Sequence, residues 1–98
     1  MTTLAIDAYI IDTLMCDLVG HDRRPSAFLV YLYLWRATHG RGEAKAQIAL
    51  LDIAQEVGLS KRSVQEALSW LSKRKLVTIS RQSITAVPEY SVLRPWRR

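Results

Sequence analysis

The feature that most constrains the fold is a pair of short amphipathic runs in residues 50–69, LLDIAQEVGLSKRSVQEALS. Two helices that cross at a tight turn need a small residue at the crossing, a flexible residue at the corner and apolar residues between them. Ala54 is the small residue and Gly58 the flexible one. The apolar wedge between the helices is then Ile53, Val57, Leu59, Val64, Ala67 and Leu68.

The same segment sets the expected bounds of these helices. The first is predicted over residues 49–57 and the second over residues 61–75, with the corner between them. Ser60 can cap the second helix, because its side-chain oxygen can accept from a free backbone amide. Upstream, residues 43–48 are expected to give one short extended segment after a glycine-rich turn.

Residues beyond the second helix alternate in the manner of β-strands. Residues 76–80 and 83–87 are rich in β-branched side chains, and two polar residues separate them, so we predict a two-stranded hairpin. Pro88 has no amide to donate to a strand ladder and therefore marks an edge or a bend. The second strand is then expected to resume at residues 90–93.

Two apolar runs precede this region. Residues 3–19 predict an amphipathic helix that ends at Gly20, and Cys16 in this helix is expected to fill the protein core. Residues 26–38 predict a second helix. The second run is apolar all round, so its far side must be covered. Either the first helix and the C-terminal part of the chain sandwich it, or it helps to form a dimer interface.

The charge distribution favours a polyanionic partner. The chain carries 14 Lys and Arg against 9 acids, a net charge of +5. Every charged residue before Arg23 is acidic, so residues 23–98 hold 14 basic groups against 5 acidic ones, a net charge of +9. The first helix is therefore the part least suited to face phosphate.

No cofactor, metal site or catalytic centre is expected, because neither histidine belongs to a ligand pattern and no nucleophile–base motif stands out. Cys16 has no partner for a disulfide within the chain. The longest apolar run, residues 27–35, falls short of the ~20 residues that span a bilayer. We therefore expect a cytoplasmic protein that is not an enzyme and has no membrane partner.

With the hairpin directly after it, the two-helix segment resembles the bacterial helix-turn-helix motif. Residues 44–94 are similar to the winged helix-turn-helix domains of bacterial, plasmid and phage regulators and replication initiators. The resemblance covers about half the chain and is carried by Ala54, Gly58, Val64, Ala67, Leu68, Leu71 and the run Lys73-Arg74-Lys75-Leu76-Val77. The sequence departs from it at Lys75, where many relatives place glycine.

The resemblance implies a mainly α fold with a small β-hairpin wing (α+β), with extra N-terminal helices. We expect an N-terminal helical pair over residues 1–40, a winged helix-turn-helix over 41–94 and a basic tail over 95–98, all in one compact domain. The basic end, residues 94–98, is either a frayed tail or a phosphate-seeking arm. Trp35 is expected in the core, and Trp70 is expected to pack against the wing or the second N-terminal helix.

The function that the resemblance implies is sequence-specific binding of double-stranded DNA, with a recognition helix over residues 60–73 in the major groove. The expected DNA-binding residues are Ser60, Lys61, Arg62, Ser63, Gln65, Glu66, Ser69, Lys73 and Arg74 on this helix, with Arg81 and Gln82 on the wing. Such a charged helix face can also be merely solvated. The cations at residues 73–75 can also serve the negative end of the helix dipole.

Three roles remain open at this point. A transcriptional regulator is the first, acting as a homodimer through the N-terminal helices. A replication or partition initiator that reads origin repeats is the second. The third is a winged-helix adaptor that binds protein and no nucleic acid, for which the recognition face should be neutral or acidic.

Overall fold

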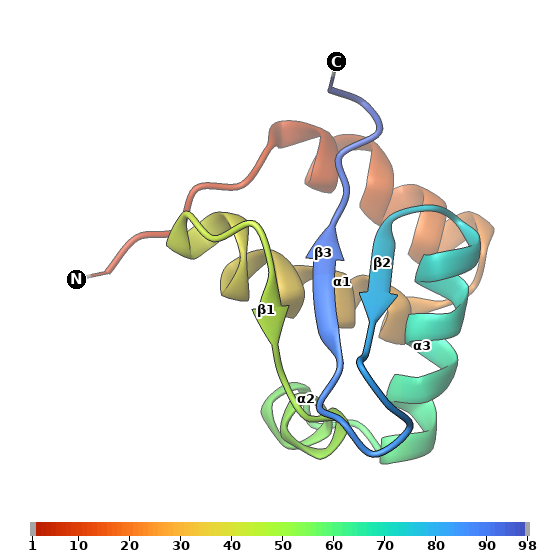
Figure 1. The fold of residues 1–98 in the computed structure, drawn as a ribbon. Helices are drawn as coiled ribbons and strands as arrows, with labels where there is room; N and C mark the ends of the chain where they lie inside the picture. The colour runs from red at the N-terminus through yellow and green to blue at the C-terminus, as the bar shows by residue number, and fades with distance from the viewer. Residues whose placement is uncertain (1, 98) are drawn as a thin grey trace.

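The computed structural model describes residues 2–97 and is mainly helical, with a small three-stranded antiparallel sheet (Figure 1). The helical elements are η1 (Ile10–Leu14), η2 (Cys16–His21), α1 (Pro25–Ala37), η3 (His39–Arg41), α2 (Leu50–Val57) and α3 (Lys61–Lys73). The strands are β1 (Ala46–Gln47), β2 (Val77–Ser80) and β3 (Glu89–Val92), in the order β1-β3-β2. This agrees with the predicted α+β class.

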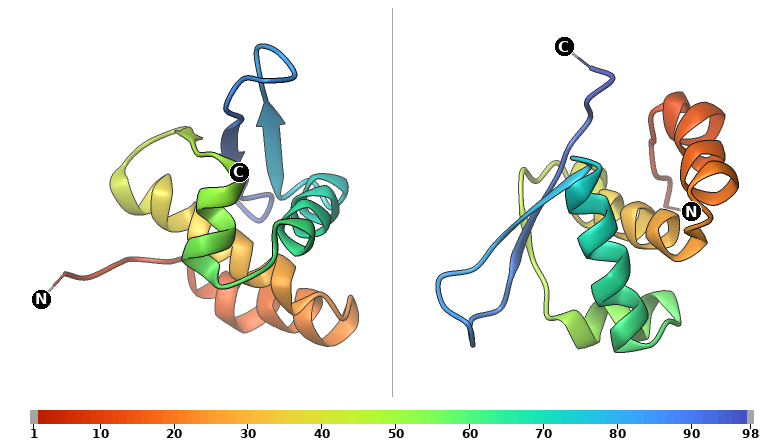
Figure 2. Two further views of the ribbon diagram at one scale, coloured as in Figure 1. Left: turned by 90° about the horizontal axis from the view of Figure 1, so that it is seen from below. Right: turned by 90° about the vertical axis from the view of Figure 1, so that its right-hand side faces the viewer.

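Helix α1 lies at the centre of the molecule. The right-hand view of Figure 2 shows the N-terminal helical segment on one side of α1 and the sheet on the other. Six of the thirteen α1 residues are buried, and the core that they enter extends from the N-terminal segment to β3. The apolar circumference of α1 is thus sandwiched within the chain, although Leu29 remains 45% exposed.

The N-terminal segment is helical, but with π-type hydrogen bonds. The amide of Met15 donates to the carbonyl of Ile10, and the amide of Asp22 donates to the carbonyl of Asp17, five residues back in each case. The wider turn places every fourth residue on the buried side. The buried residues are Ile10, Leu14 and Leu18.

Three predictions for this segment were wrong. Regular helix starts several residues after Thr3, and Gly20 lies inside η2 instead of ending the helix. The segment ends after His21, and Arg23 then turns the chain with a left-handed φ of 59°. Cys16 is exposed and does not fill the core, because it lies off the buried stripe.

The predicted helix–turn–helix over residues 49–75 is confirmed in its local geometry. Gly58 ends α2 with φ 71°, and the next amide, of Leu59, donates to Ala54 at 3.0 Å. Ser60 then caps α3, because its Oγ accepts from the amide of Ser63 at 3.0 Å. The two helices therefore meet across a glycine corner.

Helix α3 ends in a left-handed residue that is not glycine. Lys75 has φ 60°, its amide donates to Ser72 at 3.0 Å, and the amide of Leu76 donates to Leu71 at 2.9 Å. These two bonds form a Schellman cap. Helix α3 stops at Lys73, two residues before the end of the predicted run. The left-handed residue, Lys75, is the position at which the resemblance leads one to expect glycine.

The predicted second strand over residues 83–87 is wrong. Strand β2 pairs with β3, so Val77 lies opposite Val92 and Ser80 opposite Glu89, and residues 81–88 form a loop. β3 matches the stretch where the strand was expected to resume, and β1 pairs with its other edge as a third strand. The reason is burial: Tyr90 and Val92 of β3 enter the core, whereas Ile84 is 90% exposed.

The C-terminal residues pack against the N-terminal segment. The ring of Trp96 stacks on Tyr9 with centroids 4.6 Å apart, and its Nε1 donates to Asp7 at 3.0 Å. Arg97 also pairs with Asp7, at 2.7 Å. Residues 95–97 are therefore a docked end, neither a frayed tail nor a free arm, while Arg98 lies outside the described residues.

Candidate nucleic-acid interface

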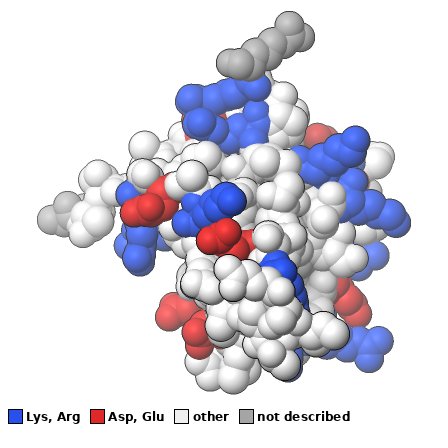
Figure 3. Space-filling view, viewed as in Figure 1, with Lys and Arg blue, Asp and Glu red and all other residues white. Residues whose placement is uncertain are grey.

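Helix α3 divides cleanly into a buried face and an exposed polar face. Apolar residues at three- and four-residue steps enter the core: Val64, Ala67, Leu68 and Leu71. The exposed face holds most of the predicted DNA-binding residues, namely Lys61, Arg62, Gln65, Glu66, Ser69 and Lys73. Figure 3 shows blue side chains gathering along the right-hand edge, where α3 lies. The three- and four-residue spacing of the apolar residues accounts for the separation of the buried face from the exposed face.

Ser60 and Ser63, which were predicted as DNA-binding residues, are engaged with each other. Ser60 Oγ accepts from the Ser63 amide and lies 2.9 Å from Ser63 Oγ, to which it donates. Ser63 is half-buried. Their present role is to fix the first turn of α3, which orients the residues that follow.

Arg62 and Glu66 form an exposed ion pair on successive turns of α3. The Nε of Arg62 donates to Glu66 Oε1 at 3.2 Å, and both side chains are largely exposed. Such a pair is weak because water screens it. Both groups can therefore separate at little cost and turn to another partner.

Two hollows flank the exposed face of α3, and Ser69 borders both. The first, of about 400 Å³, lies towards the loop before α1 and is lined by Arg24, Glu66, Ser69, Trp70 and Lys73. The second, of about 200 Å³, lies towards the sheet and is lined by Leu50, Gln65, Leu68, Ser69, Ile79, Arg81 and Tyr90. The exposed face of α3 is thus a ridge with a hollow on each side.

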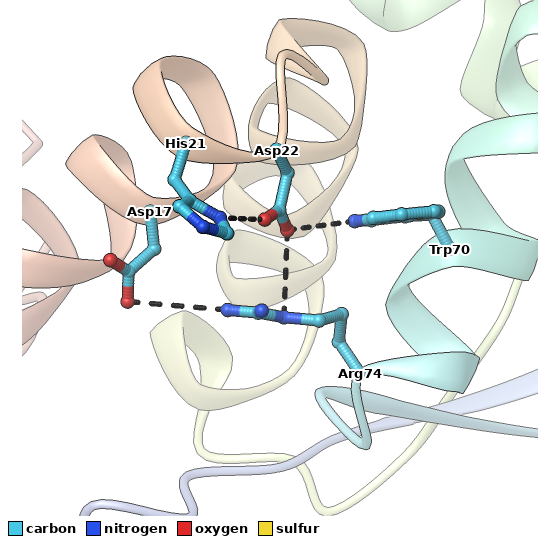
Figure 4. A network of polar contacts seen from close by, with 5 residues as sticks. All are labelled: Asp17, His21, Asp22, Trp70 and Arg74. Atoms are coloured by element: carbon cyan, nitrogen blue, oxygen red, sulfur yellow. Dashed lines mark hydrogen bonds and ion pairs between the residues drawn. The ribbon is translucent and has the colours of Figure 1, made fainter.

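Arg74, another predicted DNA-binding residue, points into a network that joins α3 to the N-terminal segment (Figure 4). Its guanidinium pairs with Asp22 at 3.5 Å and with Asp17 at 4.0 Å. The indole Nε1 of Trp70 donates to Asp22 at 2.9 Å, and His21 Nδ1 lies 2.8 Å from the same carboxylate. Trp70 therefore contacts Asp22 at the end of η2 and, through Arg24, the start of α1, which is one of the two elements predicted to pack against it.

The Asp22 carboxylate is the centre of this network. Its side chain is only 3% exposed, and this burial on its own would raise the pKa of Asp22. Hydrogen bonds from His21 and Trp70, together with the charge of Arg74, outweigh the burial and lower the pKa below its ordinary value. Asp22 therefore stays ionised and holds the two elements together.

The predicted wing residues Arg81 and Gln82 are both exposed. Arg81 Nη1 donates to the carbonyl of Ile84 at 3.4 Å inside the loop, and the same side chain borders the second hollow with Gln65. The structure thus brings Arg81 beside the α3 face. The loop that carries Arg81 and Gln82 extends to residue 88 and is therefore longer than the two-residue turn that the sequence predicted.

Arg24 is the residue beside this face that we did not predict. Its guanidinium carbon lies 4.6 Å from the centre of the Trp70 ring. The only signal in the sequence is the basic pair Arg23-Arg24 directly after the acidic N-terminal run. Nothing in that pattern indicates which element the pair will contact.

Comparison with protein-family models, with curated proteins and with solved structures gave no match. Within residues 2–97, no helix has the length and apolar character that a membrane span requires. The function of this chain therefore has to be inferred from its own geometry and charge.

Proposed function

We propose that this chain is a winged helix-turn-helix protein that binds double-stranded DNA in a sequence-specific manner. The observation that carries the proposal is the exposed polar face of α3, which is free of packing against the rest of the described chain. Helix α2 supports α3 across the Gly58 corner, and a hairpin with a long loop follows. This succession supports the resemblance drawn from the sequence.

In this proposal α3 enters the major groove, which admits one α-helix. Arg62 can bind guanine edges, Gln65 can pair with adenine and Glu66 can accept from cytosine, each contributing roughly 1–3 kcal/mol of discrimination. Lys61 at the start of the helix and Arg81 on the wing are then placed to contact phosphates.

The ion pairs within the chain support DNA binding by the α3 face, because they neutralise acids of the N-terminal segment with cations that lie outside this face. Asp17 and Asp22 pair with Arg74, and Asp7 pairs with Arg97. Among the cations of the α3 face, Arg62 alone has an ion pair within residues 2–97. The face therefore keeps an excess of positive charge, which also argues against the protein-adaptor role.

We propose a transcriptional regulator of the cytoplasm and nucleoid, and a replication or partition initiator would use the same face. We further propose a homodimer through the N-terminal helices, where Ile11, Met15 and Leu29 are 40–45% exposed. A dimer would place two recognition helices about one DNA turn, roughly 34 Å, apart. Light scattering at micromolar concentration that gives only the monomer mass would refute the dimer.

In-vitro selection from random duplexes at moderate salt tests the DNA-binding proposal. We expect an enriched motif whose half-site spacing and symmetry report the oligomer, with Arg62→Ala relaxing the preference. A chain that enriches no sequence, and binds no duplex even at low ionic strength, would overturn the proposal. Enrichment of origin-type direct repeats would favour the initiator over the regulator.

A further inference from the structure

We infer that the first hollow beside α3 is a binding site for a DNA backbone phosphate, with Arg24 and Lys73 as its cations. This inference rests on the proposed function and adds a second contact surface to it. We call this site the Trp70 hollow; its lining is Arg24, Glu66, Ser69, Trp70 and Lys73, and its volume is about 400 Å³.

Two cations converge on one aromatic ring at this site. The guanidinium carbon of Arg24 lies 4.6 Å from the centre of the Trp70 ring, and Lys73 Nζ lies 5.8 Å from it. Within residues 2–97, neither cation has an ion-pair partner. A guanidinium that stacks on an aromatic ring keeps its N–H donors at its edge, where they can bind phosphate oxygens in a bidentate manner.

The platform under Arg24 is fixed in place before any ligand arrives. Trp70 donates its Nε1 hydrogen to the buried Asp22, which Arg74 also pairs with. The backbone of Arg24 is held too, because its amide donates to the carbonyl of Leu18 at 2.7 Å. The N-terminal helical segment therefore positions a cation beside α3, and this preorganisation lowers the entropy cost of binding.

The balance of charge in the Trp70 hollow suits an anion. Glu66 is the one carboxylate in its lining, so the lining carries more positive than negative charge. Arg24 and Lys73 contribute two positive charges, and the hydroxyl of Ser69 can donate one more hydrogen bond. These are the donor types that proteins direct at phosphate oxygens.

The position of the hollow identifies the anion as part of a duplex. A helix in the major groove has one phosphate backbone on each side. The Trp70 hollow and the hollow that Arg81 borders lie on opposite sides of Ser69. Arg24 and Lys73 are thus assigned to one strand, and Arg81 to the other.

The test compares Arg24→Gln and Lys73→Gln with Arg41→Gln, a matched loss of one positive charge. Arg41 lies in η3, borders a different hollow beside β1, and has no ion pair within the described residues. Binding to the selected duplex and to a random duplex is measured by fluorescence anisotropy between 50 and 300 mM salt. Near-UV circular dichroism and a thermal melt check that each variant folds.

We expect the log–log salt slope to fall by about 0.9 in each test variant, with roughly eightfold weaker binding at 0.1 M salt. The ratio of selected to random affinity should stay unchanged, since a phosphate contact carries no base information. The Arg41 variant should keep the slope of the parent chain.

The two ways to fail are distinguishable. If the parent chain binds DNA and Arg24→Gln keeps both the parent's slope and its affinity, as the Arg41 variant should, the Trp70 hollow is not a phosphate site and the proposed function survives. If the parent binds no duplex, the proposed function and this site both fall. Titration with inorganic phosphate alone, followed by the Trp70 Nε1 NMR signal, completes the test. Saturation at low millimolar phosphate would point to a free anion and overturn the assignment to DNA.

Discussion

Replacing Lys75 with glycine should make the protein more stable, although it removes a residue that takes part in the cap of α3. Lys75 has φ 60°, in the left-handed region that residues with a Cβ seldom adopt. The cap uses only the backbone of this residue. Its amide donates a hydrogen bond to the carbonyl of Ser72, and the amide of Leu76 donates one to the carbonyl of Leu71. Glycine can make both bonds without the steric cost.

The size of the effect follows from two opposing contributions. The left-handed conformation costs an L-residue roughly 1–2 kcal/mol. Against this, glycine gives the unfolded chain more conformational freedom, which lowers the free energy of unfolding by about 0.4–1 kcal/mol. The net gain for Lys75→Gly is therefore about 1 kcal/mol, which corresponds to a rise in Tm of roughly 4–8 °C for a domain of this size.

Urea unfolding followed by circular dichroism measures this gain, and two further variants isolate its cause. Lys75→Ala removes the same charge but keeps the Cβ, so its stability should stay within about 0.5 kcal/mol of the parent. Gly58→Ala introduces the opposite change at φ 71°, where an added Cβ meets no atom within 4 Å, and should cost about 1 kcal/mol. If Lys75→Ala stabilises as much as Lys75→Gly, charge and not backbone strain is the cause, and the reasoning is wrong.

Three other predictions concern binding, acidity and the docked C-terminal end. Arg62→Ala should weaken binding to the selected duplex by roughly 1–3 kcal/mol and relax base preference, whereas Arg81→Ala should weaken all duplexes alike; equal effects of both variants on both duplexes would contradict these roles. The pKa of Asp22 in the fold lies below the ordinary aspartate value of about 4, so the ionised carboxylate stabilises the fold at pH values above that. This contribution should be lost as the pH falls from about 5 through the folded pKa. Acid titration of Asp22→Asn should therefore show a shallower loss of stability than the parent, and an unchanged slope would exclude this carboxylate as a cause. Trp96→Ala should cost about 2 kcal/mol in urea unfolding, because it removes the stack and the hydrogen bond to Asp7; a change under about 0.5 kcal/mol would mean that the end contributes little.

The sequence was most informative where local chemistry decides the structure. Gly58 and Ser60 end one helix and begin the next through hydrogen bonds that span a few residues, so their pattern could be interpreted directly. The exposed face of α3 followed from periodicity for the same reason. Burial against one side of a helix leaves a clear signature in the order of residues.

The errors arose where distant parts of the chain decide. Residues 83–87 alternate as well as β3 does, and only the core positions of Tyr90 and Val92 select the true strand. The contact of Trp70 with Asp22 joins residues 48 positions apart, and no local pattern specifies it. The place of Arg24 beside α3 depends on the same contact, because Asp22 holds the Trp70 ring over which Arg24 lies.

The stacking of Tyr9 on Trp96 has a practical consequence for anyone who prepares this protein. Tyr9 comes from the N-terminal part of the chain and Trp96 from the C-terminal part, and Trp96 also lies beside Tyr31 of α1. Removing residues from either end so that one of the two rings is lost should therefore leave the same cavity next to α1. Arg97 lies beside Asp7, so a purification handle joined after this end of the chain would start close to residues 7–9. Handles on either side should therefore be judged by whether this aromatic pair survives.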